Sequence, residues 1–96
     1  MKILITGTYQ GIGNAIANLF LDNGHIVIGI DRMDASINHK NYTHYKSDIR
    51  DYDSLPEIND VNILINNAGT QNEADIDINL KALIHITEKY GVQKEI

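Results

Sequence analysis

The 96-residue sequence predicts an α/β fold, an open parallel sheet with helices on both faces and strand order 3-2-1-4. Three observations lead to this prediction. Short β-branched apolar runs alternate with stretches of helical periodicity, as in repeated strand–helix–strand units. A glycine-rich turn joins the first strand to the first helix, and a polar segment follows the last strand. The length leaves room for one domain with a single core.

The first half of the chain predicts one complete strand–helix–strand unit. Residues 2–6 form a buried strand, residues 11–23 the helix after it, and residues 25–30 a second β-branched run. Asn23 and Gly24 supply the helix stop, since glycine readily takes the left-handed conformation favoured there. Such units are right-handed almost without exception, so both strands should end at the same edge of the sheet.

The second half predicts two more strands and a long helix, after an irregular polar stretch over residues 32–41. The expected elements, in chain order, are an edge strand at 42–46, a weak short helix at 50–58, a central strand at 61–65 and a long helix at 75–90 stopped by Gly91.

Composition excludes several classes of function. The sequence is 43% apolar and 22% charged, which is ordinary for a folded domain. Without cysteine there is no disulfide, thiolate catalysis or cysteine-ligated metal, and the cytoplasm is the expected compartment. No apolar run is long enough to span a membrane, and a net charge of −5 argues against nucleic acid as a partner. The histidines show no metal-binding spacing, so no metal is expected.

The first strand leads into the turn Thr6-Gly7-Thr8-Tyr9-Gln10-Gly11-Ile12-Gly13, and a helix leaves it. Unpaired N–H groups at the helix start therefore face whatever lies above the turn, which favours an anion such as a pyrophosphate. Gly7 can take positive φ, Gly11 leaves the main chain open to the anion, and Gly13 lets the helix press against its strand. The plainer alternative is a tight loop with no ligand.

Two further polar features fall at the same edge. Asp31 follows the second strand, and Asn66-Asn67-Ala68-Gly69 follows the fourth. In open α/β sheets the ligand crevice lies outside the carboxyl ends of the strands, here between strands one and four. Asp31 lies eighteen residues after Gly13, where a carboxylate can accept hydrogen bonds from both hydroxyls of an adenosine ribose. A solvated carboxylate at a strand end is the alternative.

These motifs resemble those of the short-chain dehydrogenase/reductase family. The resemblance rests on the glycine turn, on the pair Asp48-Ile49 and on Asn66-Asn67-Ala68-Gly69, and it covers nearly the whole chain. It implies that residues 1–96 form a dinucleotide-binding domain of the Rossmann type, truncated before its fifth strand. Proteins of this kind are oxidoreductases that pass a hydride between a nicotinamide cofactor and an alcohol or carbonyl substrate.

The resemblance also implies which residues hold the cofactor. The glycine turn would cradle the pyrophosphate, Asp48 would accept from the adenine amino group, and the Ile49 N–H would meet the adenine ring. Asp48 could instead cap the short helix that follows it. The complete expected cofactor-binding set is Gly7, Tyr9, Gln10, Gly11, Ile12, Gly13, Asp31, Arg32, Asp48, Ile49, Asn67, Ala68 and Gly69.

The charge at the end of the second strand favours NAD over NADP. A 2′-phosphate beside the Asp31 carboxylate would suffer like-charge repulsion, whereas a free ribose gains charge-assisted hydrogen bonds. Arg32 is the one neighbour that could offset this repulsion. In NADP-preferring relatives the residue at the position of Gln10 is often basic, whereas glutamine is not. Tyr9 replaces the small residue that is usual in this turn.

Most of the family's catalytic residues are not found in this sequence. A serine, a tyrosine and a lysine four residues after it do the acid–base work in such enzymes, and Asn79 resembles the asparagine that precedes them. A polar residue tolerated in a helix is the alternative for Asn79. Tyr90 and Lys94 have the tyrosine–lysine spacing, but Gly91 breaks the helix between them and Tyr90 should lie at the wrong end of the sheet. These 96 residues alone are expected to be inactive.

Three functions remain open: an oxidoreductase whose chain continues past Ile96, a noncatalytic NAD-binding module that works through a protein partner, and a fragment without a ligand. Apolar residues cover well over half the circumference of the helix at 75–90. One helix face should pack on the sheet, and the other should meet more chain or a second copy. The fourth strand also has one unpaired edge, so a homo-oligomer through this helix is expected.

Overall fold

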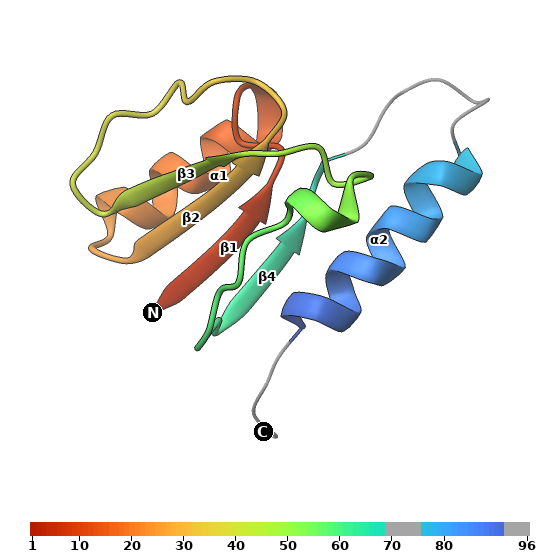
Figure 1. Cartoon of the computed structure of the whole chain (residues 1–96). Helices are drawn as coiled ribbons and strands as arrows, with labels where there is room; N and C mark the ends of the chain where they lie inside the picture. Colours follow the sequence, from red (N-terminus) through yellow and green to blue (C-terminus); the bar gives the residue numbers. More distant parts are fainter. Residues whose placement is uncertain (69–75, 92–96) are drawn as a thin grey trace.

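The structure, a computed structural model, describes residues 1–68 and 76–91, with the side chains of 76–79 excepted. Figure 1 shows an open sheet with one long helix on each face. The elements in chain order are β1 (Lys2–Thr6), α1 (Gly11–Asp22), β2 (Ile26–Asp31), β3 (Tyr42–Lys46), the 3₁₀ helix η1 (Tyr52–Ser54), β4 (Ile63–Asn66) and α2 (Ile76–Tyr90).

The strand order is β3-β2-β1-β4, and all of these neighbours are parallel, which confirms the predicted topology. Ile3 of β1 pairs with Val27 of β2 on one side and with Ile63 of β4 on the other. Within the described residues, β4 is paired only with β1. Because every strand runs the same way, their carboxyl ends meet at one edge of the sheet.

The sheet has an apolar core on each face because successive residues of a strand point to opposite sides. The face under α1 buries Ile3, Ile5, Ala17, Leu21 and Val27. The opposite face, covered by α2 and the segment before β4, buries Leu4, Ile28, Ile30, Leu55, Ile58, Val61, Ile86 and Tyr90.

The predicted helix over residues 50–58 is wrong in extent, since only the single turn of η1 forms there. Pro56 disfavours a helical conformation for the residue before it, and Leu55 is extended, with φ −71° and ψ 131°. The segment instead packs Leu55 and Ile58 onto the sheet. The fourth strand begins at Ile63 rather than at residue 61.

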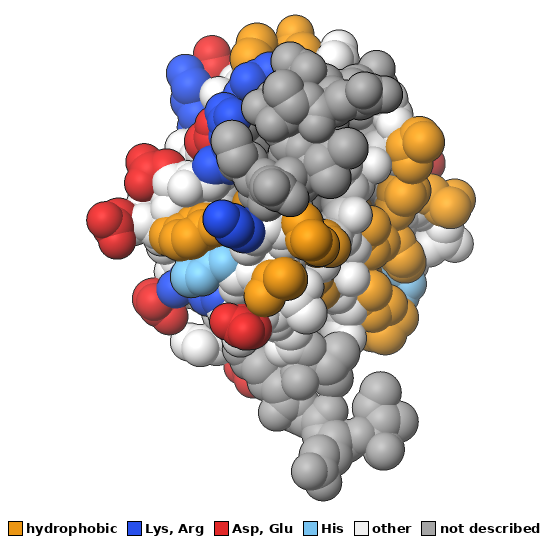
Figure 2. Space-filling model, turned by 90° about the vertical axis from the view of Figure 1, so that its right-hand side faces the viewer, with side chains coloured by type: hydrophobic (Ala, Val, Ile, Leu, Met, Phe, Trp, Pro, Cys, Tyr) orange, Lys and Arg blue, Asp and Glu red, His pale blue; other side chains and the backbone are white. Residues whose placement is uncertain are grey.

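Helix α2 has one covered and one uncovered apolar face. Ala82, Ile86 and Tyr90 are at most 1% exposed. The side chains of Leu80, Leu83 and Ile84 are 40 to 52% exposed. Figure 2 shows the side of the molecule that carries α2, where hydrophobic side chains gather near the centre and along the right-hand edge. None of the helices in the described parts of the chain has the length and apolar character that crossing a bilayer requires.

Candidate functional site

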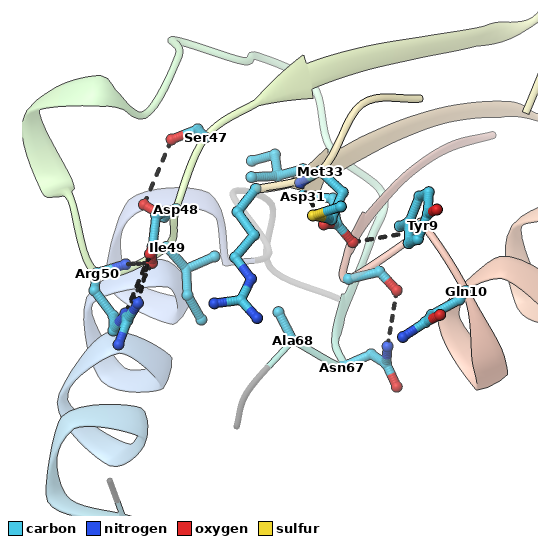
Figure 3. Close-up of a pocket in the computed structure, with 13 residues that line it drawn as sticks. Tyr9, Gln10, Asp31, Met33, Ser47, Asp48, Ile49, Arg50, Asn67 and Ala68 are labelled. Carbon is cyan, nitrogen blue, oxygen red and sulfur yellow. Dashed lines mark hydrogen bonds and ion pairs between the residues drawn. The ribbon is translucent and has the colours of Figure 1, made fainter. Parts of the chain in front are cut away.

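A cavity of about 230 Å³ opens where the carboxyl ends of the strands meet (Figure 3). Most of the expected cofactor-binding residues line it, namely Gly7, Tyr9, Gln10, Asp31, Arg32, Asp48, Ile49, Asn67 and Ala68. Ile30, Met33, Ser47 and Arg50 line it as well, although the sequence analysis did not single them out. Gly11, Ile12 and Gly13 form the first turn of α1. Gly69 and the side chain of Asn79 lie outside what the structure describes.

The glycine turn and the segment after β4 are joined by hydrogen bonds. The buried Thr6 Oγ1 accepts hydrogen bonds from the N–H groups of Asn67 and Ala68, each at 3.1 Å. In return, Asn67 Nδ2 donates to the carbonyl oxygen of Gly7 at 3.0 Å. Two motifs about sixty residues apart in the sequence therefore form one continuous wall of the cavity.

The turn depends on its glycines in different ways. Gly7 has φ of 81° and Gly11 has φ of 65°, both in the left-handed region. A Cβ on Gly13 would lie 2.0 Å from the Gly7 carbonyl oxygen and 2.5 Å from Asn67 Nδ2. At Gly11 a Cβ would meet no atom within 4 Å. Gly13 thus allows α1 to approach the turn closely, while the main chain at Gly11 stays open to a ligand.

Backbone groups in the middle of the turn are anchored by other segments. The Tyr9 N–H donates to Asp31 Oδ2 at 2.9 Å, and the Tyr9 carbonyl oxygen accepts from Ser36 Oγ at 2.6 Å. Asn14 Nδ2 of α1 donates to the Thr8 carbonyl oxygen at 3.1 Å. These contacts fix the direction in which the start of α1 points.

Asp31, the last residue of β2, joins the turn to the loop that follows β2 (Figure 3). Its Oδ2 accepts from Tyr9 and its Oδ1 accepts from the N–H of Met33, both at 2.9 Å. An ionised carboxylate offers about four lone-pair positions, so these two bonds leave acceptor capacity for a ligand's hydroxyls. The ribose-binding role of Asp31 stays a prediction.

Asp48 is paired with Arg50 at the far side of the cavity (Figure 3). The guanidinium of Arg50 donates through Nε and Nη2, with Nη2 2.7 Å from Asp48 Oδ2, and the Arg50 N–H donates to Oδ1 at 2.9 Å. The side chain of Asp48 therefore closes the tight turn that precedes η1. It does not cap η1, whose N-cap residue is Asp51. The adenine-binding role of Asp48 stays a prediction.

Hydrogen bonding from Arg50 lowers the pKa of Asp48 below its ordinary value. We expect Arg50→Gln to raise the Asp48 pKa, because the fork of charged donors is lost. The pKa of Asp48 is lower in the folded protein than in the unfolded chain. The pair with Arg50 therefore stabilises the fold at pH values above the unfolded-state pKa of Asp48. That stability is lost as the pH falls through the folded pKa. An NMR titration of the Asp48 carboxyl checks the shift, with Lys46→Gln, which removes the exposed pair with Asp34, as the control. An unchanged Asp48 titration would contradict this account.

Tyr90 is a residue of the apolar core. It is 1% exposed, and its hydroxyl donates to the Pro56 carbonyl oxygen. Burial, with a smaller contribution from Glu57, raises the pKa of Tyr90 to about 12. A tyrosine that acts as an acid–base catalyst needs a lowered pKa, so this environment is the opposite of a catalytic one. Lys94 lies outside the described residues.

Sequence reasoning missed a chain of hydrogen bonds beside the turn. Thr8 Oγ1 lies 2.7 Å from Tyr42 Oη, which lies 2.7 Å from His44 Nδ1, and His44 Nε2 lies 2.9 Å from the Met33 carbonyl oxygen. In the sequence, the histidines indicate only that metal-binding spacing is absent. The signal available was the i, i+2 spacing of Tyr42 and His44, which places both side chains on one face of β3.

Comparisons with known proteins agree with this geometry. A family model described as short chain dehydrogenase matches residues 1–90. Protein CapI of Staphylococcus aureus is 36% identical over 70 residues, covering 60% of this chain and 21% of that protein. The solved serine dehydrogenase from Escherichia coli is 26% identical, with a TM-score of 0.78 over 94% of this chain and 54% of that one.

Two further solved structures share the fold. The ligand-free aldohexose dehydrogenase of Thermoplasma acidophilum is 26% identical, with a TM-score of 0.74 over 98% of this chain and 46% of that one. A short chain dehydrogenase from Leptospira borgpetersenii serovar Hardjo-bovis with bound NAD⁺ is 20% identical, with a TM-score of 0.70 over 94% of this chain and 44% of that one. The chain spans about a fifth of the curated relative and about half of these solved chains.

Proposed function

Because the chain belongs to the short-chain dehydrogenase family, whose model matches residues 1–90, we propose that it binds NAD as the cofactor half of an oxidoreductase. The observation that carries this proposal is the wall that the glycine turn and Asn67-Ala68 build together beside Asp31. Bound NAD⁺ would accept a hydride from an alcohol, and bound NADH would donate one to a carbonyl compound.

The residues present suit the parts of a dinucleotide. The open main chain at Gly11 and the N–H groups at the start of α1 suit the pyrophosphate. The remaining acceptor positions of Asp31 suit the hydroxyls of the adenosine ribose, and Asp48 with the Ile49 N–H suits the adenine. A 2′-phosphate would meet the Asp31 carboxylate at this point, which supports NAD over NADP.

Calorimetric titration of the intact protein with NADH tests this function. We expect saturable binding of one NADH per chain, and weaker binding of NADPH. Absence of NADH binding would overturn the proposal.

The intact mass separates the enzyme from a noncatalytic module. A mass well above 10.8 kDa would support a longer chain that supplies the catalytic serine, tyrosine and lysine. A mass that matches these 96 residues, together with NADH binding, would support a module that acts through a partner.

The uncovered face of α2 supports self-association as part of the proposal. Leu80, Leu83 and Ile84 are exposed together on one side of the helix. Full burial of an exposed side chain of this kind is favourable by about 1.5–3 kcal/mol, so these half-exposed side chains would each contribute roughly half of that. We expect Leu83→Asp to shift the protein toward monomer in light scattering. The matched change Leu19→Asp on α1, at a side chain 63% exposed, should leave association unchanged. Equal masses of wild type and Leu83→Asp would count against this interface.

A further inference from the structure

The hydrogen-bonded chain from Thr8 through Tyr42 and His44 to Met33 connects two segments that line the cavity. Thr8 lies in the glycine turn, and Met33 lies in the loop after Asp31. Tyr42 and His44 both belong to β3, a strand that contributes neither segment. We propose that Thr8, Tyr42 and His44 are positioning residues that set the spacing between the pyrophosphate turn and the ribose loop.

Donor and acceptor chemistry gives the chain a single direction. The Met33 carbonyl oxygen can only accept, so His44 Nε2 carries the hydrogen of that bond. In the neutral ring Nδ1 is then an acceptor, so Tyr42 Oη donates to it. Thr8 Oγ1 in turn donates to Tyr42 Oη. The Tyr42 hydroxyl therefore accepts from Thr8 and donates to His44, so removal of this hydroxyl breaks both bonds, whereas removal of the Thr8 hydroxyl breaks one.

Gly29 of β2 makes room for this chain. A Cβ at Gly29 would lie 2.0 Å from Tyr42 Oη and 2.5 Å from Thr8 Oγ1. The strand is β-branched and apolar on either side of this glycine. A glycine inside a strand weakens it unless something must approach closely. Here the approaching groups are the two hydroxyls, which gives a structural reason for the glycine that is independent of the hydrogen bonds.

Both ends of the chain reach groups that hold Asp31. The residue after Thr8 donates its N–H to Asp31 Oδ2, and Met33 donates its N–H to Asp31 Oδ1. The hydrogen bonds from Thr8 to Met33 and the Asp31 carboxylate therefore form a closed ring of contacts around the glycine turn and the loop after β2. This inference rests on the proposed NAD binding, because NAD would contact both segments at once.

The experiment compares variants that keep or remove one hydroxyl in the intact protein. Thr8→Val should weaken NADH binding by about three- to tenfold, the effect of one net hydrogen bond, and Tyr42→Phe by at least as much, because its hydroxyl makes two. Thr8→Ser should restore wild-type affinity. The double variant should cost no more affinity than Tyr42→Phe alone, since Tyr42→Phe already breaks the one bond that Thr8→Val breaks. Tyr45→Phe, the same substitution on the same strand, is the matched control; Tyr45 points to the other face of β3.

Amide hydrogen exchange provides a readout that needs no cofactor. The Tyr9 N–H should exchange faster in Tyr42→Phe and Thr8→Val than in wild type, Thr8→Ser or Tyr45→Phe. Equal exchange in all of these proteins, or equal NADH affinity in wild type and Tyr42→Phe, would overturn the positioning role alone. Absence of NADH binding by the wild type would instead overturn the proposed function, whatever the exchange rates show.

Discussion

Gly13→Ala is expected to abolish measurable NADH binding and to destabilise the fold. The added Cβ would lie 2.0 Å from the Gly7 carbonyl oxygen, which belongs to the backbone of the turn and cannot rotate away as a side chain could. It would also press on Asn67 Nδ2, the donor that ties the turn to the segment after β4. Overpacking of this kind typically costs about 1–3 kcal/mol of unfolding free energy.

Gly24→Ala is the control for this prediction. Gly24 has φ of 81° and a Cβ there would meet no atom within 4 Å, so an alanine at this position strains the backbone without any collision. We expect it to lower the melting temperature and to leave NADH affinity unchanged. Calorimetric titration and thermal unfolding of both variants separate the two effects. Wild-type affinity in Gly13→Ala would contradict the close approach that the structure shows.

Asp31→Asn is expected to weaken NADH binding by about ten- to a hundredfold, since hydrogen bonds to charged groups contribute about 1.5–3 kcal/mol. The same change should narrow the preference for NADH over NADPH, because it removes the charge that repels a 2′-phosphate. The amide also turns one acceptor into a donor, which would face the N–H of Tyr9 or Met33.

Titrations of wild type and Asp31→Asn with NADH and NADPH measure both effects. Asp34→Asn is the control, because it neutralises a nearby exposed carboxylate that forms an ion pair with Lys46. Equal affinity of the wild type for NADPH and NADH would contradict the role assigned to Asp31.

The sheet could be predicted from the sequence because its determinants are local and periodic. The runs of β1 and β2 are mainly apolar, and the helix between them has clear periodicity and a glycine stop at Gly24. The right-handed crossover then fixes which edge carries Asp31 and the glycine turn. Asn67 and Ala68 were located by their motif after β4, and the structure brings them onto the Gly7 turn.

The remaining features depend on contacts that no local pattern encodes. Residues 50–58 carry weak helical periodicity, yet they lie across the sheet because Leu55 and Ile58 are buried there. The partnership of Thr8 with Tyr42 spans 34 positions and becomes visible only when β3 lies beside β2. The residues next to Gly29 in the sequence do not explain why this position is glycine. The reason is the close approach of the Tyr42 and Thr8 hydroxyls, which leaves no space for a Cβ.

The bonds between Thr6 and residues 67 and 68 have a consequence for the order in which the protein matures. While the chain is being synthesised, the glycine turn emerges long before the segment that supports it. A nascent chain with only β1, α1 and β2 cannot yet form the complete cofactor wall. NAD would therefore bind the chains in which β4 has docked, and binding to the native state alone stabilises that state by mass action. The cofactor would then act as a selection step in biogenesis, favouring chains in which β1 and β4 have already paired.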